Sequence, residues 1–274
     1  MLHLLNPEPA QQVLDVGTGS GYSAALLGHR LGDELVTSID VDAYLVQAAR
    51  ERLDGFGRRP RMVVADATGD LPEGEYDRMI ATVSVRPVPR SWLAALRPGG
   101  QIVTTIAQTS LLVSATLERG PVAHGSVQRD PAGFMRTRSG ADYPPRLDLV
   151  YAAARDADGD EVRDLRGPVP NLWTDWQLRD LYELDNANIE NRSATDDDGK
   201  TIVWLLAGDG SWARAEEASG KVHQSGALRL WDDLERVRAR WEQAGRFPLH
   251  DLTVEFTPEG TSVSSPDGEW TIHL

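Results

Sequence analysis

Residues 1–110 alternate short apolar runs with stretches of helical periodicity. Residues 43–53, for example, place their apolar side chains on one helical face, and Gly55 and Gly57 follow as a stop. The apolar runs are typical of buried strands and lie at residues 13–16 and 35–39, before Asp66, and at residues 76–82 and 101–106. Because strands and helices alternate, the pattern predicts a parallel sheet with right-handed crossovers.

After residue 106 the helical spacing fades. Residues 111–118 and the segment near Val127 are predicted as two strands with little helix between them. Such a connection joins antiparallel neighbours. We therefore expect an α/β sheet that is parallel at first and ends with antiparallel strands.

The second half of the chain has a different character, since seven of the eight tryptophans follow residue 146. Residues 173–184 and 228–244 are predicted helices, and the second of these carries Trp231 and Trp241 on one face. Between these helices we expect strands at residues 201–207, 211–217 and 221–225. After the second helix, residues 252–274 are expected to form a strand meander. We therefore divide the chain into domains at 1–146 and 147–274, the second a smaller α+β domain. Its tryptophans form either a core, which we favour, or a groove.

Three alternating glycines lie between the first strand and a helix that begins near Tyr22. Gly17, Gly19 and Gly21 allow a sharp turn and a close approach to a ligand. A dinucleotide fingerprint would need its third glycine at position 22. Asp15, just before the loop, would repel phosphate and attract a cation such as the sulfonium of S-adenosylmethionine. The alternative is an ordinary strand-to-helix turn.

Acidic residues end three successive strands of the predicted sheet. Ligands of open parallel sheets bind beyond these strand ends, so Asp15, Asp40 and Asp66 are expected to converge there. Asp40 suits the two ribose hydroxyls, with a helix cap as the alternative. Asp66 suits the exocyclic amine of adenine, with a turn residue as the alternative.

Composition excludes several classes of function. Without cysteine, disulfides, thiolate catalysis and cysteine-bound zinc are impossible, and the six histidines lack metal-ligand spacing, so we expect no metal. The net charge of −14 disfavours nucleic acid as a partner. The chain contains no run of about 18 apolar residues that would predict a membrane span. Its N-terminus also lacks the basic and then apolar segments of a secretion signal, so we expect a cytoplasmic protein.

The glycine-loop segment VLDVGTGSGYSAALL, the strand ending in Asp40, VVADA and ATVSVRPVPRSWLAALRPGGQIV together resemble the protein-L-isoaspartate O-methyltransferase family. The similarity covers residues 1–146 and implies a Rossmann-like class I methyltransferase sheet that binds S-adenosylmethionine. DGSWA and LWDDLERVRARWEQAGR resemble the C-terminal extension of family members found in lanthipeptide and graspetide clusters.

The resemblance also implies the roles of individual residues. In the loop after the fourth strand, Thr82 and Ser84 would be neutral hydroxyl donors in catalysis, with turn capping as the alternative. The residues expected to bind the cofactor are Asp15, Gly17, Thr18, Gly19, Gly21, Tyr22, Asp40 and Asp66.

The chain departs from the family pattern at two places. The family loop has threonine, three small residues and proline, whereas Thr82 is followed here by Val83, Ser84, Val85 and Arg86. Several family helices also precede the glycine loop, including a Ser/Thr-containing segment over the substrate, whereas only residues 1–12 precede Val13. We expect that this segment is missing through a misassigned start or a loss, or that another element replaces it.

The function expected from the resemblance is methylation of a carboxylate. An aspartate or isoaspartate side chain of a peptide or protein would be esterified and would then close to a succinimide, in the tailoring of a ribosomal peptide. General isoaspartate repair is the alternative, and a non-catalytic module that binds a peptide or partner is the alternative of another class. TVSVRPVP lacks the N/D-P-P-Y/F segment of amine methyltransferases. The sequence does not indicate the oligomeric state.

Overall fold

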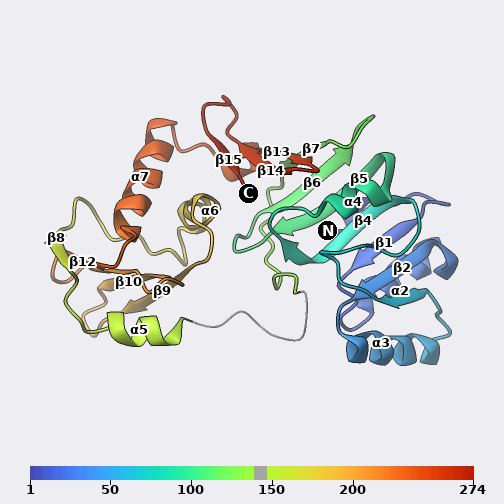
Figure 1. Cartoon of the computed structure of the whole chain (residues 1–274), viewed down its shortest axis with the longest axis horizontal. Helices are drawn as coiled ribbons and strands as arrows, with labels where there is room; N and C mark the ends of the chain where they lie inside the picture. Colours follow the sequence, from blue (N-terminus) through green and yellow to red (C-terminus); the bar gives the residue numbers. More distant parts are fainter. Residues whose placement is uncertain (139–146) are drawn as a thin grey trace. The chain divides into compact units, whose positions relative to one another are not determined.

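The computed structural model describes residues 1–138 and 147–274 and divides the chain into two compact units (Figure 1). Unit 1 comprises Met1–Tyr143 with Leu249–Leu274, and unit 2 comprises Pro144–Pro248. The domain boundary expected at residue 146 lies outside the described residues. Within them, no helix is both long enough and apolar enough to cross a membrane.

Unit 1 is built on one mixed sheet. Its spatial order is β15-β14-β13-β7-β6-β5-β4-β1-β2-β3. The strands from β3 to β5 in this order run parallel, and those from β5 to β15 pair antiparallel, which confirms the expected change of direction. The strands are β1 (Val13–Val16), β2 (Val36–Asp40), β3 (Arg61–Val64), β4 (Tyr76–Val85), β5 (Leu96–Ile106), β6 (Leu112–Leu117), β7 (Ala123–Val127), β13 (Thr253–Thr257), β14 (Gly260–Ser264) and β15 (Thr271–His273).

The chain reverses its progress across the sheet between β1 and β4. Residues of β1 pair with β2 on one side and with β4 on the other. This is the topological switch point, where open α/β sheets form a crevice beyond the strand ends. The helical segments of unit 1 are α1 (Leu2–Leu5), α2 (Tyr22–Leu31), η1 (Asp33–Leu35), α3 (Ala43–Gly55), α4 (Arg90–Ala95) and η2 (Leu249–Asp251).

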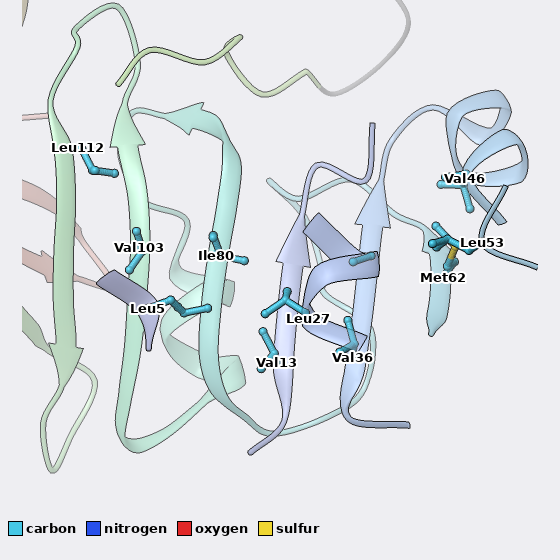
Figure 2. Packing of buried hydrophobic residues seen from close by; sticks show 12 residues of the cluster. Leu5, Val13, Leu27, Val36, Val46, Leu53, Met62, Ile80, Val103 and Leu112 are labelled. Carbon is cyan, nitrogen blue, oxygen red and sulfur yellow. The ribbon is translucent and has the colours of Figure 1, made fainter. Parts of the chain in front are cut away.

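Apolar side chains from the parallel strands and their helices form the core around the switch point (Figure 2). All four residues of β1 are buried, as expected for a strand covered on both faces. Leu27 from α2 and Leu53 from α3 contribute buried side chains to the same cluster as Val13. This packing fixes the end of β1, from which the glycine loop begins.

The fifth strand begins earlier than the sequence pattern predicts. Leu96 pairs with Tyr76 and Gln101 pairs with Arg78, so residues 97–100 form an irregularity between two paired positions. Gly99 has a φ of +83°, which accounts for the turn residues there. Residues 97–100 therefore form a bulge within β5.

The last strands differ from the expected domain organisation. We expected residues 147–274 to form one extension, whereas β13 pairs with β7 of unit 1. Val254 and Phe256 of β13 are buried. Without β13, strand β7 would be an exposed edge, and alternating apolar residues do not specify which sheet a strand completes. The long-range pairing places residues 249–274 in unit 1.

Unit 2 is an antiparallel sheet with three helices. The sheet order is β8-β12-β11-β10-β9, and Trp204 and Trp212 are buried among the residues of its strands. Trp231 and Trp241 are also buried, which supports a core role, whereas Trp173 is exposed. The elements are α5 (Asp148–Ala154), β8 (Glu161–Asp164), α6 (Trp176–Asp185), β9 (Ile189–Thr195), β10 (Thr201–Ala207), β11 (Trp212–Glu216), β12 (Lys221–Ser225) and α7 (Leu230–Gln243).

Truncation of Phe256 tests the assignment of β13 to unit 1. We expect Phe256→Ala to lower the free energy of unfolding of unit 1 by about 3–5 kcal/mol, because a buried ring is lost and a cavity remains. Urea unfolding, followed by hydrogen exchange in β4 and β5, measures the loss. Phe56→Ala is the matched control, since Phe56 is 84% exposed. Destabilisation confined to unit 2 would contradict the assignment.

Candidate active site

The glycine loop brings the backbone at the end of β1 close to β4. Gly17 has a φ of +94°, and a Cβ atom there would lie 3.0 Å from both Thr82 Oγ1 and Val83 Cγ1. A side chain at position 17 would therefore be strained and would push β1 and β4 apart. The N–H groups of Gly17 and Thr18 donate to the Ile39 carbonyl at 2.8 and 3.0 Å, which ties the loop to β2.

Asp40, the last residue of β2, holds the middle of the loop. Its carboxylate accepts hydrogen bonds from the N–H of Gly19 at 3.0 Å and from the N–H of Asp42 at 3.1 Å. The alternative role of Asp40 as the cap of α3 does not apply, because Asp42 is the N-cap residue and accepts from Tyr44 and Leu45. Asp40 instead lines a cleft at the strand ends.

This cleft of about 150 Å³ lies beyond the carboxyl ends of β1, β2 and β4. The strand ends contribute Gly17, Asp40 and Thr82 to its lining. Val41 and Leu45 add apolar surface near Asp40. A larger cleft of about 490 Å³ runs along α7 in unit 2, and Trp231 lines it, but none of the expected cofactor-binding or catalytic residues does. The three strand ends therefore define the candidate site.

Asp15 lies beneath the loop rather than in the lining of the cleft. It is fully buried, and its carboxylate accepts hydrogen bonds of 2.7 Å from the hydroxyls of Ser23 and Ser38. The Ser38 hydroxyl also lies 2.7 Å from that of Thr18. Burial raises the pKa of Asp15 to about 6, despite these hydrogen bonds, because the ionised carboxylate loses its hydration. Any attraction of Asp15 for a cation therefore acts through the loop.

Other residues expected at the cofactor site have different positions. Thr18 is buried against Ser38, and Gly21 is the N-cap residue of α2. The side chain of Tyr22 is 71% exposed. Asp66 accepts hydrogen bonds from the N–H and hydroxyl of Thr68, as a turn residue would, while Ala65 and Ala67 on either side of it line the cleft. None of these four residues is in the described lining.

The two expected catalytic hydroxyls already have partners within the protein. Thr82 lines the cleft, and its hydroxyl donates to the Gly17 carbonyl at 2.9 Å. Ser84 is buried outside the described lining and donates to the Phe134 carbonyl at 2.7 Å, while its oxygen lies 2.8 Å from the Thr105 hydroxyl. The structure thus differs from the expected catalytic role of Ser84. Because its one proton is used internally, Ser84 anchors a neighbouring segment.

That segment, residues 134–138, was not expected at the site, and we call it the strap. The N–H of Ser84 donates to the Met135 carbonyl and the N–H of Thr137 donates to the Ser84 carbonyl, both at 2.9 Å. Ser84 and Arg136 thereby form a parallel β-bridge. Met135, Arg136, Thr137 and Arg138 all line the cleft. The two arginines that flank Thr137 were the feature of the sequence that could have indicated a binding segment. Nothing in the neighbouring sequence indicated that this segment pairs with β4.

Asp15 gives the protein a pH dependence that an amide would lack. A carboxylate whose pKa is about 6 in the folded state and roughly 4 when unfolded favours folding at low pH, and this contribution is lost as pH rises through 6. At pH 8 we expect Asp15→Asn to raise the free energy of unfolding by about 1–3 kcal/mol relative to wild type. Below about pH 4 this advantage should vanish.

Urea unfolding between pH 4 and pH 8 measures this difference between Asp15→Asn and wild type. Glu259→Gln, which removes one exposed charge in the same unit, is the control. If the difference in stability between Asp15→Asn and wild type stayed constant from pH 4 to pH 8, the raised pKa would be refuted.

Comparison with known proteins places the first part of the chain in a family. Residues 1–121 match the family model described as Protein-L-isoaspartate(D-aspartate) O-methyltransferase (PCMT). Proteins named protein-L-isoaspartate O-methyltransferase from Methanopyrus kandleri and Aeropyrum pernix are 38% and 34% identical over 39% and 47% of this chain. These alignments cover 49% and 52% of the relatives, so the chain spans about half the length of the curated relatives it matches.

A solved structure of a protein-L-isoaspartate O-methyltransferase shows the same fold over more of the chain. Its TM-score is 0.51 at 19% sequence identity, and the alignment covers 96% of this chain and 78% of that one. The glycine loop and strands β1 to β6 thus lie in the part of the chain that the family model matches, whereas β7, the strap and β13 to β15 lie outside it. Residues 1–121 form a domain of the protein-L-isoaspartate O-methyltransferase family.

Proposed function

We propose that this chain is a carboxyl O-methyltransferase that uses S-adenosylmethionine and acts on an aspartate or isoaspartate side chain of a peptide or protein. The observation that carries the proposal is the cleft formed by Gly17, Asp40 and Thr82 at the switch point of a domain of this family. It combines an exposed loop backbone with a carboxylate at the end of β2. Both features suit a ligand that carries positive charge and ribose hydroxyls.

The residues present fit this cofactor chemically. Asp40 would accept hydrogen bonds from the ribose, and Val41 and Leu45 offer apolar contacts to a purine. The buried Asp15, which lies under the loop, favours a cation over a phosphate at this place. When bound, S-adenosylmethionine supplies an electrophilic methyl group on a sulfonium.

The cleft must widen to admit such a molecule, since small-molecule sites have volumes of about 300–1,000 Å³. The strap lies at one side of the cleft, and Met135 is 69% exposed there. Side chains that have little burial to lose can move at small cost. We therefore expect the exposed side chain of Met135, rather than the buried strand ends, to move aside.

The proposed reaction requires little acid–base catalysis by the protein. A carboxylate is ionised at pH 7 and needs no general base. In agreement, neither histidine nor lysine is among the residues that line the cleft in the described part of the chain. The protein's work is to align the carboxylate oxygen and to exclude water from it. Thr82 contributes as a positioning residue, because its hydroxyl fixes the Gly17 carbonyl.

Two ranges of substrate fit this chemistry. Esterification makes the carboxyl carbon a better electrophile, and attack by the next backbone nitrogen releases methanol and closes a succinimide. Repair of isoaspartate is supported by the names of the relatives. Tailoring of a ribosomal peptide is supported by the resemblance of unit 2 to extensions in peptide clusters. The fold similarity to a protein-L-isoaspartate O-methyltransferase covers 96% of the chain, so a second unit does not by itself favour tailoring.

Calorimetry with S-adenosylhomocysteine tests the cofactor site. We expect Asp40→Ala to weaken binding by about tenfold to a hundredfold, because hydrogen bonds to a charged group are lost. Asp70→Ala, which removes an exposed carboxylate outside the cleft, is the control and should bind as wild type does. Equal affinities in the two variants would remove Asp40 from the site.

Mass spectrometry of peptides tests the reaction. We expect an isoaspartyl peptide incubated with protein and S-adenosylmethionine to gain one methyl group and then lose methanol, since the ester closes spontaneously. Transfer to unrelated isoaspartyl sequences would indicate repair, and transfer confined to one dedicated peptide would indicate tailoring. A protein that binds the cofactor but methylates neither isoaspartyl nor aspartyl peptides would be a non-catalytic binding module.

A further inference from the structure

The strap brings two arginines to the cleft that contains Asp40. Arg136 is exposed and Arg138 is half-buried, and both line the cleft with Gly17 and Asp40. The strap is held on β4 through Ser84, whereas Asp40 ends β2, and β1 lies between these two strands. The cleft therefore has an acidic residue at its β2 side and two basic residues at its β4 side.

This local charge is opposite to that of the whole chain. The protein has 42 acidic and 28 basic residues, for a net charge of −14. A protein of this charge repels an acidic peptide at a distance, so such a substrate needs local cations where it binds. Among the described residues that line the cleft, Arg136 and Arg138 are the cations.

Arginine is well suited to position a carboxylate. Its planar guanidinium donates paired N–H groups to carboxylate oxygens, which fixes orientation as well as position. Residues i and i+2 of an extended segment lie on the same face, and Arg136 takes part in a parallel β-bridge with Ser84. The two guanidinium groups are thus on one face of the strap.

We propose that Arg136 and Arg138 hold the free carboxylate of the aspartyl or isoaspartyl residue that accepts the methyl group. This inference rests on the proposed function, since it names how the same cleft recognises its substrate. The guanidinium groups would orient the carboxylate so that one of its oxygens faces the methyl group of a cofactor bound beside Gly17 and Asp40. The new oxygen–carbon bond forms from that oxygen, the carbon–sulfur bond of the sulfonium breaks, and its electron pair returns to sulfur. The anionic carboxylate becomes a neutral ester, which the arginines hold less tightly, so the product is released.

The carboxylate of the cofactor's own methionine part is an alternative ligand for the arginines in the same cleft. The two roles differ in what the arginines bind. A substrate clamp affects the affinity for the peptide and leaves the affinity for the cofactor unchanged. A cofactor clamp weakens binding of the cofactor whether or not a peptide is present.

The test is fluorescence anisotropy of a labelled isoaspartyl hexapeptide with saturating S-adenosylhomocysteine. We expect Arg136→Gln and Arg138→Gln each to weaken peptide binding by about tenfold or more, with S-adenosylhomocysteine affinity within about twofold of wild type. Arg129→Gln removes an exposed arginine outside the cleft and should retain wild-type affinity for both. Arg136→Lys should recover only part of the affinity, because an ammonium lacks the paired donors.

A second peptide with serine in place of isoaspartate separates carboxylate recognition from a structural effect. Wild type should prefer the isoaspartyl peptide, and the double variant Arg136→Gln, Arg138→Gln should bind both peptides equally. An unchanged preference in a folded double variant would overturn the proposal. Equal loss of S-adenosylhomocysteine affinity would assign the arginines to the cofactor and also overturn it.

The proposed function has its own readout in this experiment. If wild type methylates the isoaspartyl peptide and the arginine variants keep its KM, the clamp is wrong and the methyltransferase assignment stands. If wild type binds S-adenosylhomocysteine but neither methylates nor binds aspartyl or isoaspartyl peptides, the proposed function fails, and the clamp fails with it.

Discussion

The buried carboxylate of Asp15 joins the parts from which the candidate site is made. Through Ser23 it contacts α2, and through Ser38 it contacts β2 and, one hydroxyl further, Thr18 of the glycine loop. These contacts fix the loop over the end of β1. They also hold the carboxylate among hydroxyl groups in the interior, where burial raises its pKa to about 6. At neutral pH the fold thus retains an electrostatic cost that a cationic ligand above the loop would offset.

The close approach of β1 to β4 depends on the same loop. Gly17 leaves no room for a Cβ atom against Thr82 and Val83, and the Thr82 hydroxyl then reaches the Gly17 carbonyl. The cleft is therefore shaped by backbone on the β1 side and by hydroxyl and apolar groups on the β4 side. Such an arrangement fits the proposed methyl transfer, which needs alignment of the reacting atoms and exclusion of water more than proton transfer.

Local sequence patterns predicted the parts of the structure that depend on local causes. Apolar runs indicated the parallel strands, because a strand buried on both faces consists mostly of apolar residues. The glycine spacing indicated the loop, because glycine is favoured where φ is positive. The position of Asp40 followed from strand polarity alone. The functional roles of Asp15 and Asp40 stay predictions, but their placement near the loop could be derived from the sequence.

The features that the sequence did not indicate all arise from long-range pairing. β13 pairs with β7, and the strap pairs with β4 through Ser84. These partners are far apart in the sequence, and neither hydrophobic periodicity nor a motif indicates such pairs. Ser84 illustrates the difficulty, since a hydroxyl in a predicted catalytic loop is equally suited to donate to Phe134. The sequence placed Thr82 and Ser84 in a loop after the fourth strand, whereas both lie within β4, and of the two only Thr82 lines the cleft.

The proposed function requires that a positively charged methyl donor bind over the glycine loop of unit 1. A crystal structure of the chain with S-adenosylhomocysteine tests it most directly. We expect density for the ligand across Gly17 and Gly19, with its ribose at Asp40 and the side chain of Met135 moved out of the cleft. Density in another cleft, such as the one along α7, with the glycine loop left empty, would contradict it.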